Sequence, residues 1–222
     1  MNTRKILLAI FVIFLFTSTS LFAVDFSFGV KGGVNLATFG GEDTFIYGMD
    51  STMKFGFSAG VFGSVILSDM VSIQPSVLFT LKGTAFELWG LTGYEYYHYY
   101  YIEIPILVKF YPPMHMFHSA LLTSDVKPNV FAGSYLGINL FAKYFDTGEV
   151  RELSESLGFA PEGDVEDVAT LDYGLVFGVG VDYKQFLTEL SFSLGLASVD
   201  ASELEIDWKN FVITLMVGYR IL

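Results

Sequence analysis

The segment Phe211–Ile221 reads FVITLMVGYRI and alternates large apolar side chains with small, polar or charged ones. Successive side chains of an extended strand point to opposite faces, so the alternation separates the two kinds of residue. A strand with one strongly apolar face and one polar face is typical of transmembrane β-barrels. One face carries Phe211, Ile213, Leu215, Val217, Tyr219 and Ile221, and the other carries Thr214, Met216, Gly218 and Arg220.

Earlier segments of about ten residues show the same alternation. They span residues 26–36, 55–67, 71–82, 100–110, 129–140, 171–182 and 186–196. The interior of an eight-stranded barrel is just wide enough for side chains, so the large apolar faces of all the strands cannot point inward. The pattern predicts an all-β fold, an eight-stranded antiparallel up-and-down transmembrane β-barrel whose apolar faces meet lipid. A secreted, lipocalin-like barrel is the alternative, and it requires those faces to point inward around a ligand.

The N-terminus has the organisation of a secretory signal. Arg4 and Lys5 precede the apolar run 6–16, and Ala23 offers a small residue at a cleavage point. The apolar run is too short to cross a bilayer as a helix, which takes roughly 20 residues. We therefore expect residues 1–23 to be a cleaved signal peptide and residues 24–222 to form the outer-membrane barrel domain.

The composition excludes several classes of protein. Without Arg4 and Lys5, 10 of the 12 basic residues remain against 24 acidic ones, a net charge of −14. Such a charge argues against nucleic acid as a partner, because it repels phosphate. The chain has no cysteine, which excludes disulfides, thiolate metal sites and lipid attachment through an N-terminal cysteine.

Long and short connections alternate along the chain, as they do in barrels whose two ends both lie in the periplasm. We expect the protein to lie in the outer membrane of a bacterium. Its extracellular loops are expected at residues 38–54, 83–97, 141–170 and 198–210. The segment 111–127 is long for a periplasmic turn. A further hairpin hidden in the third of these loops would raise the strand number to ten.

Charged residues on inward strand positions are predicted to fill the lumen. Basic and acidic residues are balanced among them, and a charge buried without a partner is costly, so we expect them to pair and close the barrel. The alternative is a narrow polar conduit or a ligand pocket lined by the same side chains. The predicted network comprises Lys31, Lys82, Glu103, Lys109, Asp172, Asp182, Glu189 and Arg220.

Two other groups of residues point to the outer boundary. A run of tyrosines predicts an interface aromatic belt, since tyrosine favours the headgroup region; a tyrosine-lined surface for a sugar or protein is the alternative. Residues 145–170 are strongly acidic, with Arg151 as their basic residue. We expect a solvated loop there, with a cation site or a patch for a basic ligand as the alternative. The belt comprises Tyr94, Tyr96, Tyr97, Tyr99, Tyr100 and Tyr101.

Catalytic chemistry has little support in the residues. The histidines are His98, His115 and His118, and no motif joins one of them to a serine and an aspartate as nucleophilic catalysis requires. His115 and His118 could bind a metal on a helical turn, but two ligands make an incomplete site. We expect no enzymatic activity, no catalytic residue, no resident metal and no cofactor.

Several segments together resemble the PorT family of small outer-membrane β-barrels. The most specific is Tyr101–Lys109, which is similar to that family's fourth-strand motif. The resemblance implies an outer-membrane barrel, and some relatives take part in protein export. The other matching segments are Gly29–Leu36, Gly60–Phe62, Ile73–Pro75, Lys82–Gly83, Lys127–Gly133 and Gly178–Val181.

The favoured function is structural or surface-interacting and is carried by the extracellular loops. A narrow pore or a transport- or secretion-associated barrel is the alternative, and a lipid-modifying enzyme is a third possibility. The expected partners are outer-membrane lipid, the barrel-assembly machinery and an extracellular ligand or protein at the acidic loops.

Overall fold

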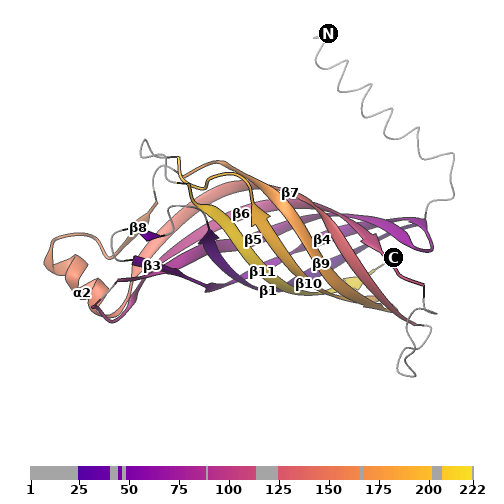
Figure 1. Ribbon diagram of the computed structural model, residues 1–222, viewed down its shortest axis with the longest axis horizontal. Helices are drawn as coiled ribbons and strands as arrows, with labels where there is room; N and C mark the ends of the chain where they lie inside the picture. The colour runs from indigo at the N-terminus through magenta and orange to yellow at the C-terminus, as the bar shows by residue number, and fades with distance from the viewer. Residues whose placement is uncertain are drawn as a thin grey trace, which may run out of the picture.

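The computed structural model describes residues 25–40, 45–46, 49–88, 90–113, 125–165, 168–201 and 207–221. Eight long strands form a closed antiparallel ring in which each strand pairs with the next along the chain and the last returns to the first. The predicted eight-stranded up-and-down barrel is therefore confirmed (Figure 1). The ring consists of β1 (Asp25–Gly40), β4 (Lys54–Ser68), β5 (Val71–Leu88), β6 (Tyr94–Phe110), β7 (Val126–Asp146), β9 (Leu171–Tyr183), β10 (Phe186–Gly195) and β11 (Lys209–Arg220).

In the described part of the chain, four smaller elements lie outside the ring. β2 (Phe45–Ile46) pairs with β3 (Met49–Thr52), which pairs with β5, and β8 (Glu162–Asp164) pairs with β7. The helix α2 (Gly148–Ser156) follows β7 directly. Because β8 joins β7 alone, the ring has eight strands and the ten-stranded alternative is wrong.

The loops of the structure are shorter than the predicted ones, because the strands continue into them. β5 runs to Leu88 and β6 starts at Tyr94, so most of the expected loop 83–97 is a hairpin. β7 likewise continues to Asp146, well into the expected loop 141–170. Ladder hydrogen bonds between neighbouring strands explain the extension. They continue where the side chains no longer alternate between apolar and polar, so alternation alone predicts strands that are too short.

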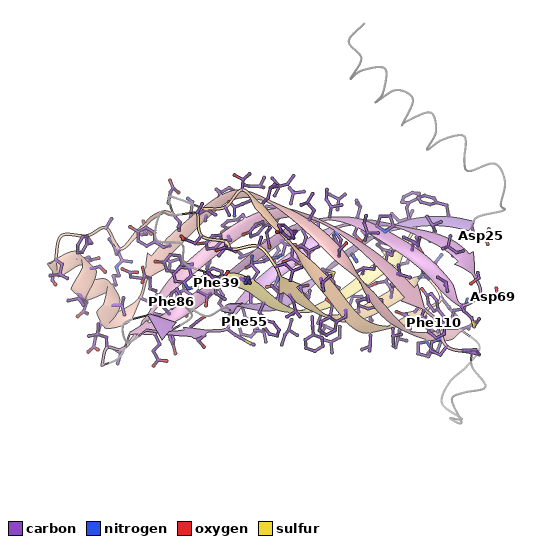
Figure 2. All side chains as sticks on the ribbon, turned by 45° about the horizontal axis from the view of Figure 1, so that its top comes forward. Asp25, Phe39, Phe55, Asp69, Phe86 and Phe110 are labelled. Carbon is purple, nitrogen blue, oxygen red and sulfur yellow. The ribbon has the colours of Figure 1, made fainter. Side chains whose placement is uncertain are left out.

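The barrel has two unlike ends. At the turn end, the tight connections Asp69–Met70 and Lys184–Gln185 join β4 to β5 and β9 to β10. At the loop end lie β2, β3, α2 and β8, and the extended β5, β6 and β7 carry α2 away from the ring (Figure 1). Asp25 and Asp69 mark the turn end in Figure 2, and Phe39 and Phe86 mark the loop end. Most of the long segment 111–127 lies outside the described residues.

The two faces of the strands differ as the alternation predicts. Apolar side chains cover the outside, where Phe55 is 77% exposed, and charged and polar side chains lie inside. Lys82, Lys109 and Gln74 are at most 1% exposed. The inward-facing, lipocalin-like arrangement is therefore wrong. No helix within the described ranges is both long and apolar enough to cross a bilayer.

A β-bulge interrupts the β6–β7 ladder. Tyr100 pairs with Phe141 and Tyr101 pairs with Asn139, so Leu140 has no partner between them. One extra residue reverses which positions of β7 face inward, and beyond it Ala142 is buried. The bulge therefore allows β7 to continue toward the loop end with a new set of inward side chains.

Adjacent glycines on β1 give a matched test of how tightly the ring closes. A Cβ at Gly33 would lie 1.9 Å from the Leu215 carbonyl oxygen of β11, whereas one at Gly32 would lie 3.5 Å from its nearest neighbour, the Ser58 carbonyl oxygen. We expect Gly33→Ala to lower the free energy of unfolding by about 1–3 kcal/mol, because backbone must move. Gly32→Ala should change it by less than about 0.5 kcal/mol. Urea unfolding in lipid vesicles measures both, and equal effects would contradict the close approach.

Candidate functional site

The lumen brings together all the predicted interior charges. Alternation along each strand places them on inner faces, and the ring brings strands that are distant in sequence around one narrow space. They form a turn-end network centred on Glu189 and Asp182 and a mid-barrel network centred on Lys82. With four basic and four acidic members, the networks together are neutral.

Glu189 on β10 is the centre of the turn-end network. Lys31 Nζ of β1 donates to Glu189 Oε2 at 3.1 Å, and Lys109 Nζ of β6 lies 2.6 Å from Oε1. Gln74 of β5 donates its side-chain amide to the same Oε1 at 2.8 Å. One carboxylate therefore holds two lysines and an amide from three other strands.

Asp182 on β9 extends this network toward the turn end. Its carboxylate lies 3.8 Å from Lys109 Nζ and pairs with Arg220 of β11. Tyr111 donates its hydroxyl to Asp182 Oδ2 at 3.0 Å, and Asn129 donates its amide to Oδ1 at 3.2 Å. Lys109 therefore links the two carboxylates, and Arg220 lies at the more exposed edge of the group.

Lys82 on β5 is the centre of the mid-barrel network. It pairs with Glu103 of β6, and its Nζ donates to Asp172 Oδ2 of β9 at 3.1 Å. Asp172 also accepts hydrogen bonds from the Tyr135 hydroxyl at 3.1 Å and the Asn210 amide at 2.9 Å. The Tyr135 ring lies 4.1 Å from Lys82 Nζ, a cation–π contact.

The neutral partners were not identified from the sequence. Gln74, Asn129, Tyr135 and Asn210 carry the same inward signal as the charges. To predict which charge each of them contacts, one must know which distant residue lies opposite in the barrel. Gln74 and its partner Glu189, for example, are separated by 115 positions. Inward polarity on a predicted strand is the signal that could have found them.

A small cavity lies between the two networks. Its volume is about 30 Å³, and it is lined by residues that include Lys31, Lys82, Glu103 and Glu189. Such a volume accommodates about two water molecules. Within the part of the chain that the structure describes, the middle of the lumen is therefore filled rather than open.

An aromatic cluster fills the barrel interior at the loop end. The Phe39 ring stacks on Trp208 at 5.6 Å and meets Tyr99 edge-on at 5.5 Å. Phe86 lies 5.5 Å from Trp208. Tyr101, which is 0% exposed, joins this cluster from β6. Figure 2 labels Phe39 and Phe86 at this end.

The predicted aromatic belt divides between the two faces of β6. Tyr99 and Tyr101 are buried in the interior cluster, and Tyr97 packs against it, so these three cannot form an interface belt. The cause is alternation, which sends neighbouring tyrosines to opposite faces. Tyr94, Tyr96 and Tyr100 have the other orientation, and Tyr100 stacks on Phe141 at 4.4 Å.

Reciprocal hydrogen bonds hold α2 against the β5–β6 turn. The Thr92 backbone N–H donates to Glu149 Oε2 at 2.7 Å, and the Glu149 N–H donates to the Thr92 carbonyl at 2.6 Å. The Tyr94 N–H donates to Thr147 Oγ1 at 3.0 Å. The hydrogen bond from the Thr92 N–H holds the pKa of the Glu149 carboxyl below its usual value. The start of α2 is therefore fixed to the barrel.

The acidic loop shows no assembled cation site in its described part. Across the described ranges of the chain, no group of three or more histidine, aspartate or glutamate side chains gathers as metal ligands would. Arg151 pairs with Glu155 at 2.9 Å on the exposed side of α2. Glu166, Asp167, His115 and His118 lie outside the described residues.

Comparisons with known proteins give a family and several structural likenesses. The family model described as outer membrane protein beta-barrel domain matches residues 20–201. No curated protein matches the chain. Among solved structures, the attachment invasion locus protein Ail of Yersinia pestis is 14% identical with a TM-score of 0.41, covering 88% of this chain and 98% of that one.

Two more solved structures are similar to the chain. Neisserial surface protein A is 14% identical with a TM-score of 0.45, covering 88% of this chain and 98% of that one. Escherichia coli outer membrane protein W is 17% identical with a TM-score of 0.36, covering 88% of this chain and 97% of that one.

Removing the carboxylate of Glu189 tests the turn-end network. Glu189→Ala leaves Lys31 and Lys109 buried without this partner, so we expect the free energy of unfolding to fall by about 3–5 kcal/mol. Glu155→Ala, which breaks an exposed pair, should cost less than about 1 kcal/mol. Urea unfolding in lipid vesicles provides both values. A loss at Glu189 no larger than that at Glu155 would argue against the network.

Proposed function

Because the chain belongs to the outer membrane protein β-barrel domain family, we propose that it is a closed anchor in the bacterial outer membrane whose function resides on its loop-end surface. The observation that carries this proposal is the filled lumen. Buried ion pairs occupy its turn-end half and middle, and aromatic rings occupy its loop-end part. The cavity between the two ion-pair networks, about 30 Å³, is far smaller than a conducting path requires.

The energetics of the ion pairs support a lumen that stays closed. Opening a path past Lys82 would separate it from Glu103 and Asp172. Removing one partner from a buried pair costs about 3–5 kcal/mol, and a conduit would have to disrupt several such pairs together. A narrow pore is therefore the less favoured function.

The surface of α2 supports an interaction role. Leu157 and Phe159 are 63% and 68% exposed, and Leu153 is exposed beside them. Glu149, Glu152 and Glu155 place negative charge on the same helix. We assign this surface to a partner outside the cell, a protein or ligand with basic groups around an apolar patch.

The proposed orientation places the turn end in the periplasm and the loop end outside. Short turns face the periplasm in barrels of this class, and longer loops face outward. β1 begins at Asp25 and β11 ends at Arg220, both at the turn end, so both termini are proposed to be periplasmic. Outer-membrane lipid and the barrel-assembly machinery are the partners that this placement implies.

The proposal includes no enzymatic step and no cofactor. The buried carboxylates of the lumen are engaged with lysine, arginine or neutral donors, and the cavity beside them is too small for a substrate. We also propose PorT-type membership within the broader family. The segment Tyr101–Lys109 supports it, since Glu103 and Lys109 from that motif both take part in the lumen networks.

Conductance tests whether the barrel is closed. Protein purified from the outer membrane and inserted into a planar lipid bilayer should show no discrete current steps, because paired charges and aromatic rings fill the lumen. An established porin inserted in the same bilayer provides the control. Reproducible single-channel steps from folded protein would replace the anchor function with a pore or a transport-associated function.

Cysteine labelling tests the orientation. The chain has no cysteine, so Glu152→Cys on α2 and Asp69→Cys at the turn end each create a single thiol. A membrane-impermeant maleimide should label Glu152→Cys on intact cells and should label Asp69→Cys only after the outer membrane is opened. Labelling in the reverse pattern would invert the proposed orientation.

A further inference from the structure

β4 and β5 separate near the loop end. Their last ladder pair in that direction is Ser58 with Thr80, and beyond it β5 pairs with β3 instead. Gly83, with φ +126°, lies in β5 at this separation. A Cβ at this position would lie 2.0 Å from the Tyr97 carbonyl oxygen, so a larger residue does not fit. Because the β4–β5 ladder ends at Ser58, residues 54–57 of β4 have no ladder partner on β5.

Lys54, the first residue of β4, lies where β4 and β5 no longer pair. It is only 3% exposed, and its Nζ donates to the Lys82 carbonyl oxygen at 3.2 Å. This carbonyl lies in the part of β5 where β4 no longer pairs. No carboxylate among the described side chains forms an ion pair with Lys54, whereas Lys31 pairs with one carboxylate and Lys82 and Lys109 pair with two each. A buried ammonium group with a single backbone acceptor retains two unused donors.

A hollow of about 520 Å³ opens beside Lys54, and Lys54 is part of its lining. The other side of the hollow is aromatic. The Phe145 ring lies 5.0 Å from Tyr96 and 4.8 Å from His98, and Tyr94 continues this wall 5.7 Å from Tyr96. The volume falls within the usual range for sites that bind small molecules, roughly 300–1,000 Å³.

The hollow lies at the loop-end edge of the apolar outer surface. Phe55, directly after Lys54, lines it and is the most exposed of the large apolar residues on the outside. Figure 2 shows Phe55 on the outside of the barrel. Lys143, the ladder partner of His98, is exposed and adds a second positive charge nearby. The site thus combines cations and aromatic rings above a surface that meets acyl chains.

We propose that this hollow binds a phosphate-bearing membrane lipid, with its phosphate at Lys54 and its acyl chains along the apolar surface beside Phe55. A phosphate oxygen provides the acceptors that the Lys54 ammonium lacks. The ring N–H of His98 and the exposed Lys143 offer further contacts to the headgroup. Tyrosines at this depth are suited to the headgroup region, because the ring is apolar and the hydroxyl is polar. The lining of the hollow includes none of the lumen ion-pair residues and no residue of α2, so the proposal does not depend on the anchor function.

Native mass spectrometry of the folded full chain in a non-ionic detergent tests the proposal. We expect dimyristoyl phosphatidic acid to bind with a stoichiometry of one and dimyristoylglycerol, which has the same chains without phosphate, to bind at least about tenfold more weakly. This comparison uses the unaltered protein, so it remains valid if a variant fails to fold. Equal retention of the two lipids would overturn the proposal.

Lys54→Gln removes the charge and keeps an amide donor for the Lys82 carbonyl. We expect phosphatidic acid to bind about tenfold more weakly to this variant, whereas Lys127→Met, at an exposed lysine of the opposite end, should bind it normally. Inorganic phosphate distinguishes the source of the anion. Displacement of the lipid by equimolar phosphate, or unchanged lipid binding by Lys54→Gln, would overturn the assignment to a membrane lipid.

Discussion

The pairing of β1 with β11 is the contact on which the rest of the structure depends. Lipid offers no hydrogen-bond partner to an unpaired strand edge, so a sheet in the membrane must close on itself. The register from Gly29 with Arg220 to Gly40 with Lys209 closes it along most of β1. Closure with eight strands leaves an interior only as wide as side chains, and that interior must be filled. Ion pairs fill this interior in the turn-end half and the middle, and aromatic rings fill it at the loop end.

The ion pairs in the lumen also fix the register of the strands. A slip of one residue would turn Lys31, Lys109 or Glu189 toward lipid, where a charge is costly. Seven of the eight strands contribute to the networks through charged or neutral partners, and Lys109 connects the carboxylates of β9 and β10. The turn-end network has one more basic than acidic member and the mid-barrel network one more acidic than basic, so among the described residues their charges balance only when the two networks are taken together. The result is a compact neutral plug made from residues that are far apart in sequence.

The fold was predictable from the sequence because a two-residue period is a strong signal when one face must meet lipid. The eight strands, their inward charges and the outward apolar faces all follow from that period. The strand extensions were not predictable in this way. Tyr99 and Tyr101 are buried with Phe39 and Phe86, and Tyr97 and Trp208 pack against them, so both faces of β6 are aromatic here and alternation gives no contrast. The specific lumen pairs, such as Lys82 with Asp172, depend on register and tilt, which a single sequence does not contain.

Lys82 connects the charged lumen with the loop-end rim of the barrel. Its side chain pairs with Glu103 and Asp172 in the lumen, while its backbone carbonyl accepts the hydrogen bond from Lys54 at the rim. The lumen lysine has two carboxylates, and the rim lysine has a backbone oxygen alone among the described groups. Lys54 and Lys82, which are joined by this hydrogen bond, therefore differ in how their charges are compensated. Carboxylates of the protein neutralise Lys82, whereas Lys54 has donors available to an anion. Because the Lys82 side chain is held by its carboxylates, an anion at Lys54 can be bound without opening the lumen.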